Sequence, residues 1–274
     1  MARKEQEERQ PPRSAWRYLS YFAAGTAALV FGILVFQRLE HYLITDPKFL
    51  MAAPAEYGEE SASLHVEGVR HASRAQVMQT FSEDFGRSVY LFPIARRRME
   101  LLAVPWVKDA SIVRIWPNKA AVRIVEREPV AFVPLKTDDP AAGLRTALID
   151  DEGVILEARG ATRFHLPVLT GVQQEESRDL RRAKVRRMQK VLEEIGPLAE
   201  KLSEIDITSL DNVKVSLPVD SRAMTLLLGN RHYQPKLENF FKHYPEIRKR
   251  LPDAMILDLR IEDRITAVEG GTGE

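Results

Sequence analysis

The stretch that decides the fold is Trp106–Val133, which reads WVKDASIVRIWPNKAAVRIVEREPVAFV. Two runs rich in β-branched residues flank the tetrapeptide Trp116–Lys119. Valine and isoleucine favour strands, whereas proline and asparagine favour tight turns. The sequence therefore predicts a β-hairpin whose turn lies at Trp116–Lys119.

Three shorter elements precede this hairpin. Leu64, Val66 and Val69 predict a short strand before a turn at Gly68. A helix is predicted after Ser73, which forms a capping box with Gln76, and a second helix is predicted to begin at Pro93. The order strand–helix–helix–strand–strand predicts a small folded unit at residues 64–133.

Residues 19–37 are predicted to cross a membrane as one helix. No charged side chain occurs from Leu19 to Phe36, and at about 1.5 Å of rise per residue this stretch spans roughly 27 Å, close to the thickness of the hydrocarbon layer. Basic residues are more frequent before the span than in the segment after it, so the positive-inside rule places the tail 1–18 in the cytoplasm. The basic residues before the span are Arg3, Lys4, Arg9, Arg13 and Arg17.

Two other interpretations of the apolar stretch are weaker. A cleaved signal peptide would use the small-x-small pattern Ala53-Pro54-Ala55, but the stretch exceeds a 7–15-residue h-region and the pattern lies too far downstream. A buried helix of a soluble protein is disfavoured because the stretch has no polar face. Residues 38–63 are rich in Pro, Ala, Gly and acidic residues and are predicted to form a linker.

The rest of the chain predicts a mostly antiparallel β domain with flanking helices at 134–268, which gives an α+β fold overall. Apolar runs on both sides of Asp150–Gly153 predict a second hairpin. A helix is predicted from Pro235, with Pro245 breaking or kinking it, followed by a last strand from Ala254. The earlier helix and strands are predicted at Glu175–Ile195, Glu204–Thr208, Asn212–Leu217 and Ala223–Gly229, and the tail 269–274 is predicted to be disordered.

Composition and motifs argue against catalysis, metal binding and nucleic-acid binding. The net charge of +1 is unlike that of a dedicated nucleic-acid binder, and the absence of cysteine excludes disulfides and thiolate chemistry. The six histidines show no H-E-x-x-H spacing, so we expect no metal, no cofactor and no catalytic site. We interpret Asp150, Asp151 and Glu152 as a solvated hairpin turn rather than as an acid/base or metal site.

A basic run, Arg96–Arg98, lies on the predicted helix that begins at Pro93. Its opposite face would be apolar, formed by Ala95, Met99 and Leu102. We expect the arginines to form a solvated face, the alternative being contact with lipid headgroups or a partner.

The last predicted strand is the sharpest site hypothesis. From Met255 to Glu262 every second residue is apolar, so one face would be buried. A strand near the carboxyl end is often a sheet edge, and such an edge can accept a strand from another chain. The alternative is an edge that is covered or blunted by its charges.

Several motifs together resemble the FtsQ family of bacterial division proteins, called DivIB in some lineages. The segment Pro105–Ala131 is similar to the family's POTRA hairpin pattern, and the resemblance extends over the whole chain. It implies a basic tail, one span, a linker, a POTRA domain and a β domain. The further matching stretches are Leu148–Gly153, Leu166–Gly171, Leu226–Gly229, Phe240–Pro245 and Asp258–Arg260.

The resemblance implies a non-catalytic scaffold of the septal cell-wall machinery, anchored in the inner membrane with periplasmic domains and located at the division septum. It implies docking of an FtsB-like protein, itself paired with an FtsL-like protein, on the last strands and the preceding helix. From Ile261 to Thr266 the chain has neither the glycine nor the aromatic residues of enterobacterial-type relatives, and the first glycine after Arg260 is Gly270, so the anchoring side chains differ. The expected partner-binding residues are Ile256, Asp258, Leu259, Arg260, Ile261 and Glu262.

Two other functional classes fit the sequence less well. A POTRA-containing envelope secretion or assembly factor would be expected to show several POTRA repeats or a following barrel, and the sequence predicts one POTRA pattern. A membrane-anchored hydrolase would need a nucleophile or metal motif such as G-x-S-x-G, which does not occur. We expect neither nucleic acid nor a small-molecule substrate as a ligand.

Overall fold

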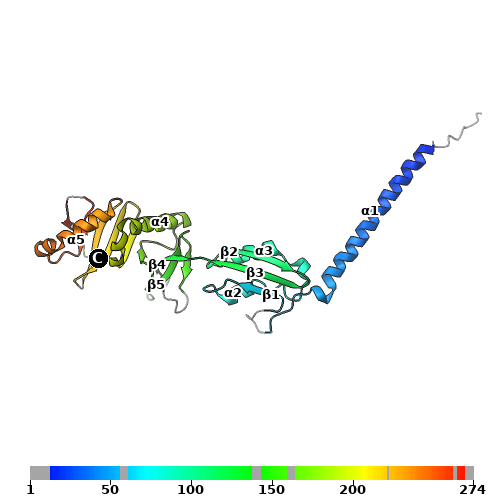
Figure 1. The fold of residues 1–274 in the computed structure, drawn as a ribbon, viewed down its shortest axis with the longest axis horizontal. Helices are drawn as coiled ribbons and strands as arrows, with labels where there is room; N and C mark the ends of the chain where they lie inside the picture. Colours follow the sequence, from blue (N-terminus) through cyan, green and yellow to red (C-terminus); the bar gives the residue numbers. More distant parts are fainter. Residues whose placement is uncertain are drawn as a thin grey trace, which may run out of the picture. The chain divides into compact units, whose positions relative to one another are not determined.

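The computed structural model describes residues 13–55, 61–137, 143–158, 164–220, 222–261 and 264–268. These form an α+β protein with one apolar helix near the amino terminus, as predicted (Figure 1). The chain divides into two units. The first comprises residues 1–69, 73–101 and 110–124, and the second comprises the others.

Helix α1 (Arg13–Thr45) is the one described helix that is long and apolar enough to cross a membrane. It extends beyond the predicted span at both ends, because Gln37–Thr45 consists mostly of good helix formers. The predicted linker is also partly ordered. A short 3₁₀ helix, η1 (Pro47–Phe49), follows α1 and is capped by Asp46, and Met51 is buried.

The first unit contains the predicted strand–helix–helix–strand–strand order of a POTRA domain. Its sheet has the order β1-β3-β2, with β1 parallel to β3. Ser73 caps α2 as the sequence predicted, by accepting a hydrogen bond from the Gln76 N–H. The elements are β1 (Leu64–Glu67), α2 (Arg74–Gln79), the 3₁₀ helix η2 (Val89–Leu91), α3 (Ile94–Leu102), β2 (Val107–Ile115) and β3 (Lys119–Glu126).

Helix α3 buries a different face from the one predicted. Arg97 and Leu101 are buried, whereas Met99 is 67% exposed. The expectation of a fully solvated arginine run is therefore wrong for Arg97. Its guanidinium forms ion pairs with the carboxylates of Glu83, Asp84 and Glu100. Sequence periodicity does not reveal these partners.

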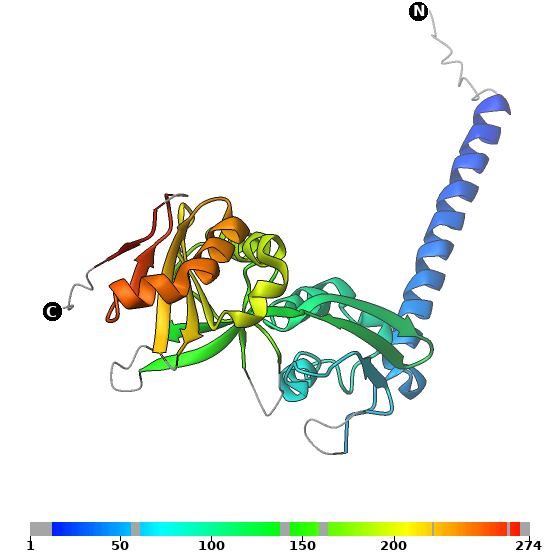
Figure 2. The ribbon, with the colours of Figure 1, turned by 60° about the vertical axis from the view of Figure 1, so that its left-hand side comes forward.

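The second unit contains a three-stranded sheet, β4-β5-β6, and a six-stranded sheet, β12-β11-β10-β9-β8-β7. The predicted boundary at residue 133 falls inside β4, which pairs with β5. Helices α4 and α5 lie against the strands of this unit (Figure 2). Their buried side chains form one core with alternate residues of the strands. The elements are β4 (Pro129–Lys136), β5 (Leu144–Asp150), β6 (Ile155–Glu157), β7 (Leu169–Thr170), α4 (Arg178–Ile195), the 3₁₀ helix η4 (Gly196–Lys201), β8 (Glu204–Ser209), β9 (Asn212–Val219), β10 (Arg222–Gly229), α5 (Tyr233–Arg250), β11 (Ile256–Asp258) and β12 (Thr266–Ala267).

The hairpin between β5 and β6 forms as predicted, but its carboxylates are not all solvated. Asp150 is fully buried and accepts hydrogen bonds from the N–H groups of Glu152 and Val154. Its other oxygen lies 2.6 Å from Arg127 Nη1. The interpretation of a solvated turn is therefore wrong for Asp150, because Arg127 compensates its charge from a distant point in the sequence.

Candidate partner-binding site

The candidate site lies at the end of the six-stranded sheet and depends on α5 for its position. Strand β10 runs into α5, which returns the chain so that β11 pairs parallel to β10, with Leu226 opposite Leu257. The helix is held in place by an apolar face, since Tyr233, Leu237 and Phe240 are all buried. This crossover fixes β11 as the penultimate strand of the sheet.

Pro245 neither ends nor interrupts α5, which continues to Arg250. Proline removes one helical N–H and usually disrupts a helix interior. Here Pro245 is exposed, so water can satisfy the carbonyl that loses its donor. Of the two predicted effects, a break or a kink, the break does not occur.

A buried lysine closes the turn between β10 and α5. Lys236 Nζ donates to the carbonyl oxygens of Leu228 and Arg231 at 2.8 Å and 2.9 Å. Gly229 ends β10 with a φ of +77°, a conformation that favours glycine. A Cβ added there would lie 3.4 Å from Arg260 Cγ, so the turn packs directly against the candidate site.

Strand β11 is not the free edge that the sequence suggested. Strand β12 pairs antiparallel with it, with Leu257 opposite Ala267. The last strand of the sheet, among the described residues, is therefore β12. A strand of two residues is too short to give a periodic signal, which explains why sequence reasoning missed it.

The predicted site residues divide by exposure. Leu259 is buried, Ile256 and Asp258 are partly buried, and Arg260 and Ile261 are exposed, while Glu262 lies outside the described residues. The predicted alternation holds for Leu257 and Leu259, which are both buried, but not at its ends. Met255 is 57% exposed and Ile261 is 65% exposed, because the strand itself covers only Ile256–Asp258.

Asp258 and Arg260 form an ion pair on the surface of the site. Arg260 Nη2 lies 2.6 Å from Asp258 Oδ2, and the Arg260 N–H also donates to Asp258 Oδ1. The hydrogen bond from Arg260 is the main reason that the pKa of Asp258 lies below its usual value. At neutral pH the pair offers one carboxylate and one guanidinium side by side.

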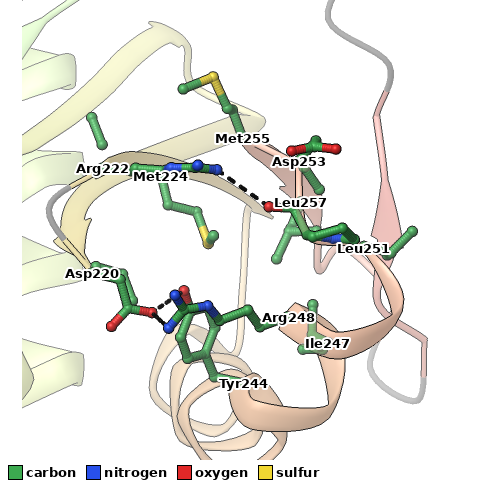
Figure 3. A pocket seen from close by; sticks show the side chains of 14 residues that line it. Asp220, Arg222, Met224, Tyr244, Ile247, Arg248, Leu251, Asp253, Met255 and Leu257 are labelled. Carbon is green, nitrogen blue, oxygen red and sulfur yellow. Dashed lines mark hydrogen bonds and ion pairs between the residues drawn. The ribbon is translucent and has the colours of Figure 1, made fainter.

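Two pockets beside β11 were not predicted. The first, of about 290 Å³, lies between the carboxyl end of α5, the start of β10 and the segment before β11 (Figure 3). Met224 and Leu257 contribute apolar surface, and on its other side Asp220 accepts a hydrogen bond from Tyr244 and pairs with Arg248. A second pocket, of about 620 Å³, is lined by residues 250–256 and by Ala267 and Val268.

Burial, together with the hydrogen bond to Asp220, raises the pKa of Tyr244 above its usual value. Tyr244 therefore stays neutral and donates to Asp220 across the physiological range. This keeps the wall of the first pocket polar where α5 meets the turn between β9 and β10.

No group of three or more histidine and carboxylate side chains able to hold a metal occurs among the described residues. Asp150 and Glu152 make ion pairs with Arg127, so they serve packing in this arrangement. The surface features of the site are thus a sheet end, two pockets, two ion pairs and exposed apolar side chains.

Comparisons with known proteins point to one family. Residues 61–127 match the family described as POTRA domain, FtsQ-type, and residues 141–260 match cell division protein FtsQ/DivIB, C-terminal. Similar proteins, each named cell division protein FtsQ, come from Koribacter versatilis (29% identity over 76% of this chain), Novosphingobium aromaticivorans (32% over 56%) and Syntrophotalea carbinolica (23% over 74%). The matches cover 59%, 45% and 71% of those relatives, so the chain spans about half the length of the first two.

Proposed function

As the chain belongs to the FtsQ/DivIB family of cell division proteins, we propose that it is a non-catalytic scaffold linking membrane and septal cell-wall synthesis proteins. The observation that carries this proposal is the sheet end formed by β12. A segment of an FtsB-like protein, itself paired with an FtsL-like protein, adds a strand to this edge. The scaffold thereby brings its partners together at the membrane.

Backbone geometry supports strand addition at β12. The N–H of Val268 donates to the Ile256 carbonyl, toward β11. Hydrogen-bonding direction alternates along an antiparallel strand, so the N–H and C=O of Ala267 point to the outer side. Among the described residues no strand lies on that side. Unpaired groups of this kind are what an added strand uses.

Side chains around the edge supply selectivity. Met255 and Ile261 are exposed apolar residues, and Asp258 and Arg260 form an ion pair between them in the sequence. Met255 lines both pockets. A partner that combines an extended segment with apolar side chains and a charge would contact all of these features.

The membrane helix supports the proposed location. Helix α1 has the length and composition of a span, and the basic residues before it favour a cytoplasmic amino terminus. Both folded units would then lie in the periplasm, and the protein would gather at the septum. A reporter active outside the membrane should work when fused after Glu274 and not before Leu19, and the reverse pattern would contradict this topology.

The docking proposal is tested with Ala267→Pro in the whole chain, co-produced with the FtsB-like protein of the same genome. Proline at position 267 removes the N–H that points outward. It does not remove the Val268 N–H, which donates to the Ile256 carbonyl on the inner side. We expect the dissociation constant to rise at least ~10-fold, which corresponds to a loss of about 1.4 kcal/mol or more of binding free energy. Ala267→Val keeps the N–H and should bind like the parent. Equal binding by both variants, at equal melting temperatures, would place docking elsewhere.

A fluorescent fusion in dividing cells separates this function from its rival. A band at mid-cell is expected for a division scaffold. Uniform labelling of the envelope, in cells where the fusion supports growth, would instead favour an envelope secretion or assembly factor.

A further inference from the structure

Three aromatic rings connect the end of α1 to the tip of the β2–β3 hairpin, all within the first unit. Tyr42, in the last turn of α1, contacts Phe49 edge-on with 5.6 Å between ring centroids, and Phe49 contacts Trp116 in the same way at 5.8 Å. In addition, the Ser88 hydroxyl donates to the Leu43 carbonyl oxygen at 2.6 Å. These contacts place the hairpin tip beside the end of the apolar helix.

Large apolar side chains are exposed in the turn and along the end of β2 that leads into it. Trp116 is 52% exposed, Ile115 is 46% exposed and Val113 is 58% exposed. Contiguous exposed apolar side chains mark contact sites for proteins or membranes. Two exposed lysines, Lys48 and Lys119, lie in the same short segments as Phe49 and Trp116. The combination of aromatic rings with lysines suits a lipid headgroup layer, where both are enriched.

The length of α1 puts the tip at the right depth. The uncharged stretch ends at Phe36, and Tyr42 follows about 9 Å further along the helix axis at 1.5 Å per residue. If the stretch is centred in the bilayer, Phe36 lies about 13 Å from the midplane and Tyr42 about 22 Å from it. Headgroups extend to about 20–22 Å from the midplane. Tyr42 therefore reaches the outer headgroup layer, and the ring contacts of 5.6 Å and 5.8 Å connect Phe49 and then Trp116 to it.

We propose that the tip of the POTRA hairpin, Ile115–Lys119, rests in the headgroup layer of the membrane that α1 crosses. Trp116 supplies an amphipathic ring, and Lys48 and Lys119 supply positive charges for anionic headgroups. The occupant of this exposed patch is thus the lipid surface rather than another protein. The inference rests on α1 being the membrane anchor.

The chain has no cysteine, so single cysteines can carry a spin label in the whole protein reconstituted into phosphatidylcholine–phosphatidylglycerol vesicles. Asn118→Cys, in the turn, reports on the tip, and Arg123→Cys, at an exposed position of the following strand β3, is the control. Collision with oxygen, which prefers lipid, is compared with collision with a water-soluble nickel chelate. We expect a severalfold loss of nickel collisions at position 118 relative to position 123. Adding Trp116→Ser to the 118 label should restore much of that loss.

Equal nickel collision rates at positions 118 and 123 would overturn the proposal. A label at Leu29→Cys separates this failure from failure of the anchor, because it must show the high oxygen and low nickel signature of hydrocarbon if α1 spans the bilayer. Protection at position 118 that persists in detergent without lipid would also overturn the proposal, since the shielding would then come from protein.

Discussion

Arg97 and Asp84 form a buried ion pair in the first unit, with 2.6 Å between Arg97 Nε and Asp84 Oδ2 and 4% of each side chain exposed. Arg97 also reaches Glu100 at 2.6 Å and Glu83 at 3.2 Å. The hydrogen bond with Asp84 is the main cause of a raised pKa at Arg97, which outweighs the effect of burial. The guanidinium thus stays charged and ties α3 to the turn after α2.

Arg97→Ala should destabilise the first unit by about 3–5 kcal/mol, because it leaves Asp84 buried without its partner. Arg96→Ala, at a mostly exposed position of the same helix, should cost no more than ~1 kcal/mol. Thermal unfolding of the detergent-solubilised chain measures both. The double variant Arg97→Met with Asp84→Leu should recover most of the loss, and equal melting of the two single variants would contradict a stabilising pair.

Asp150→Asn should destabilise the second unit by about 2–5 kcal/mol, because the asparagine amide leaves Arg127 without its buried carboxylate. Asp151→Asn is the matched control, since Asp151 is exposed in the same turn and lies 3.8 Å from its lysine partner. Chemical denaturation monitored by near-UV circular dichroism compares them. Similar midpoints for the two variants would mean that Arg127 finds compensation from Glu152 alone.

The pairing of Glu152 predicts an acid-sensitive contribution to stability. The hydrogen bond from Arg127 is the main cause of a lowered pKa at Glu152. A carboxyl whose folded pKa is lowered stabilises the fold above its unfolded value of about 4.3, and this is lost as pH falls through the folded pKa. The melting-temperature difference between the parent and Glu152→Gln should therefore be full at pH 6–7 and shrink below about pH 4. A constant difference down to pH 3 would contradict this assignment.

Gly68→Ala should destabilise the first unit more than Gly86→Ala. Both glycines have positive φ, +89° and +77°, which costs an alanine roughly 1 kcal/mol. A Cβ at position 68 would also lie 2.0 Å from the Ile124 carbonyl oxygen, whereas a Cβ at position 86 meets open space. Equal losses in thermal unfolding would show that the β1 turn can move away from β3.

Arg260→Glu should leave stability nearly unchanged, within ~1 kcal/mol, because the Asp258–Arg260 pair is partly exposed. If the pair lies in the docking surface, the reversal weakens partner binding by ~2–5 kcal/mol, roughly 30-fold or more. Arg186→Glu, at an exposed position of α4, is the control for net charge. Calorimetry with the FtsB-like protein compares them, and unchanged affinity for Arg260→Glu combined with Ile256→Asp would exclude β11 from docking.

Local sequence signals predicted the elements well where one segment carried its own pattern. The turn at Trp116–Lys119 and the cap at Ser73 form as predicted. Long-range compensation was not predictable in the same way. The burial of Arg97 depends on Asp84, and that of Asp150 depends on Arg127, and neither partner follows from helical or strand periodicity.

The candidate site was predicted only in part, because it too depends on contacts between segments that are far apart in the sequence. Leu257 and Leu259 are buried as the alternation indicated, but the strand that covers β11 consists of Thr266 and Ala267 alone. The first pocket beside Met255 is lined by the end of α5 and by β10. These elements lie beside Met255 only after the crossover has formed. Tertiary assembly, rather than local propensity, creates these features.

The shortness of β12 also protects the protein from polymerising with itself. The edge offers the outward N–H and C=O of Ala267, and two such hydrogen bonds contribute only about 1–3 kcal/mol net. A dissociation constant of 1 mM already needs about 4 kcal/mol, so two copies meeting edge to edge in the membrane plane separate again. A partner whose side chains also fill the pockets around Met255 exceeds that threshold. If docking occurs at this edge as proposed, its shortness would allow a heterologous complex without supporting an open-ended chain of identical copies.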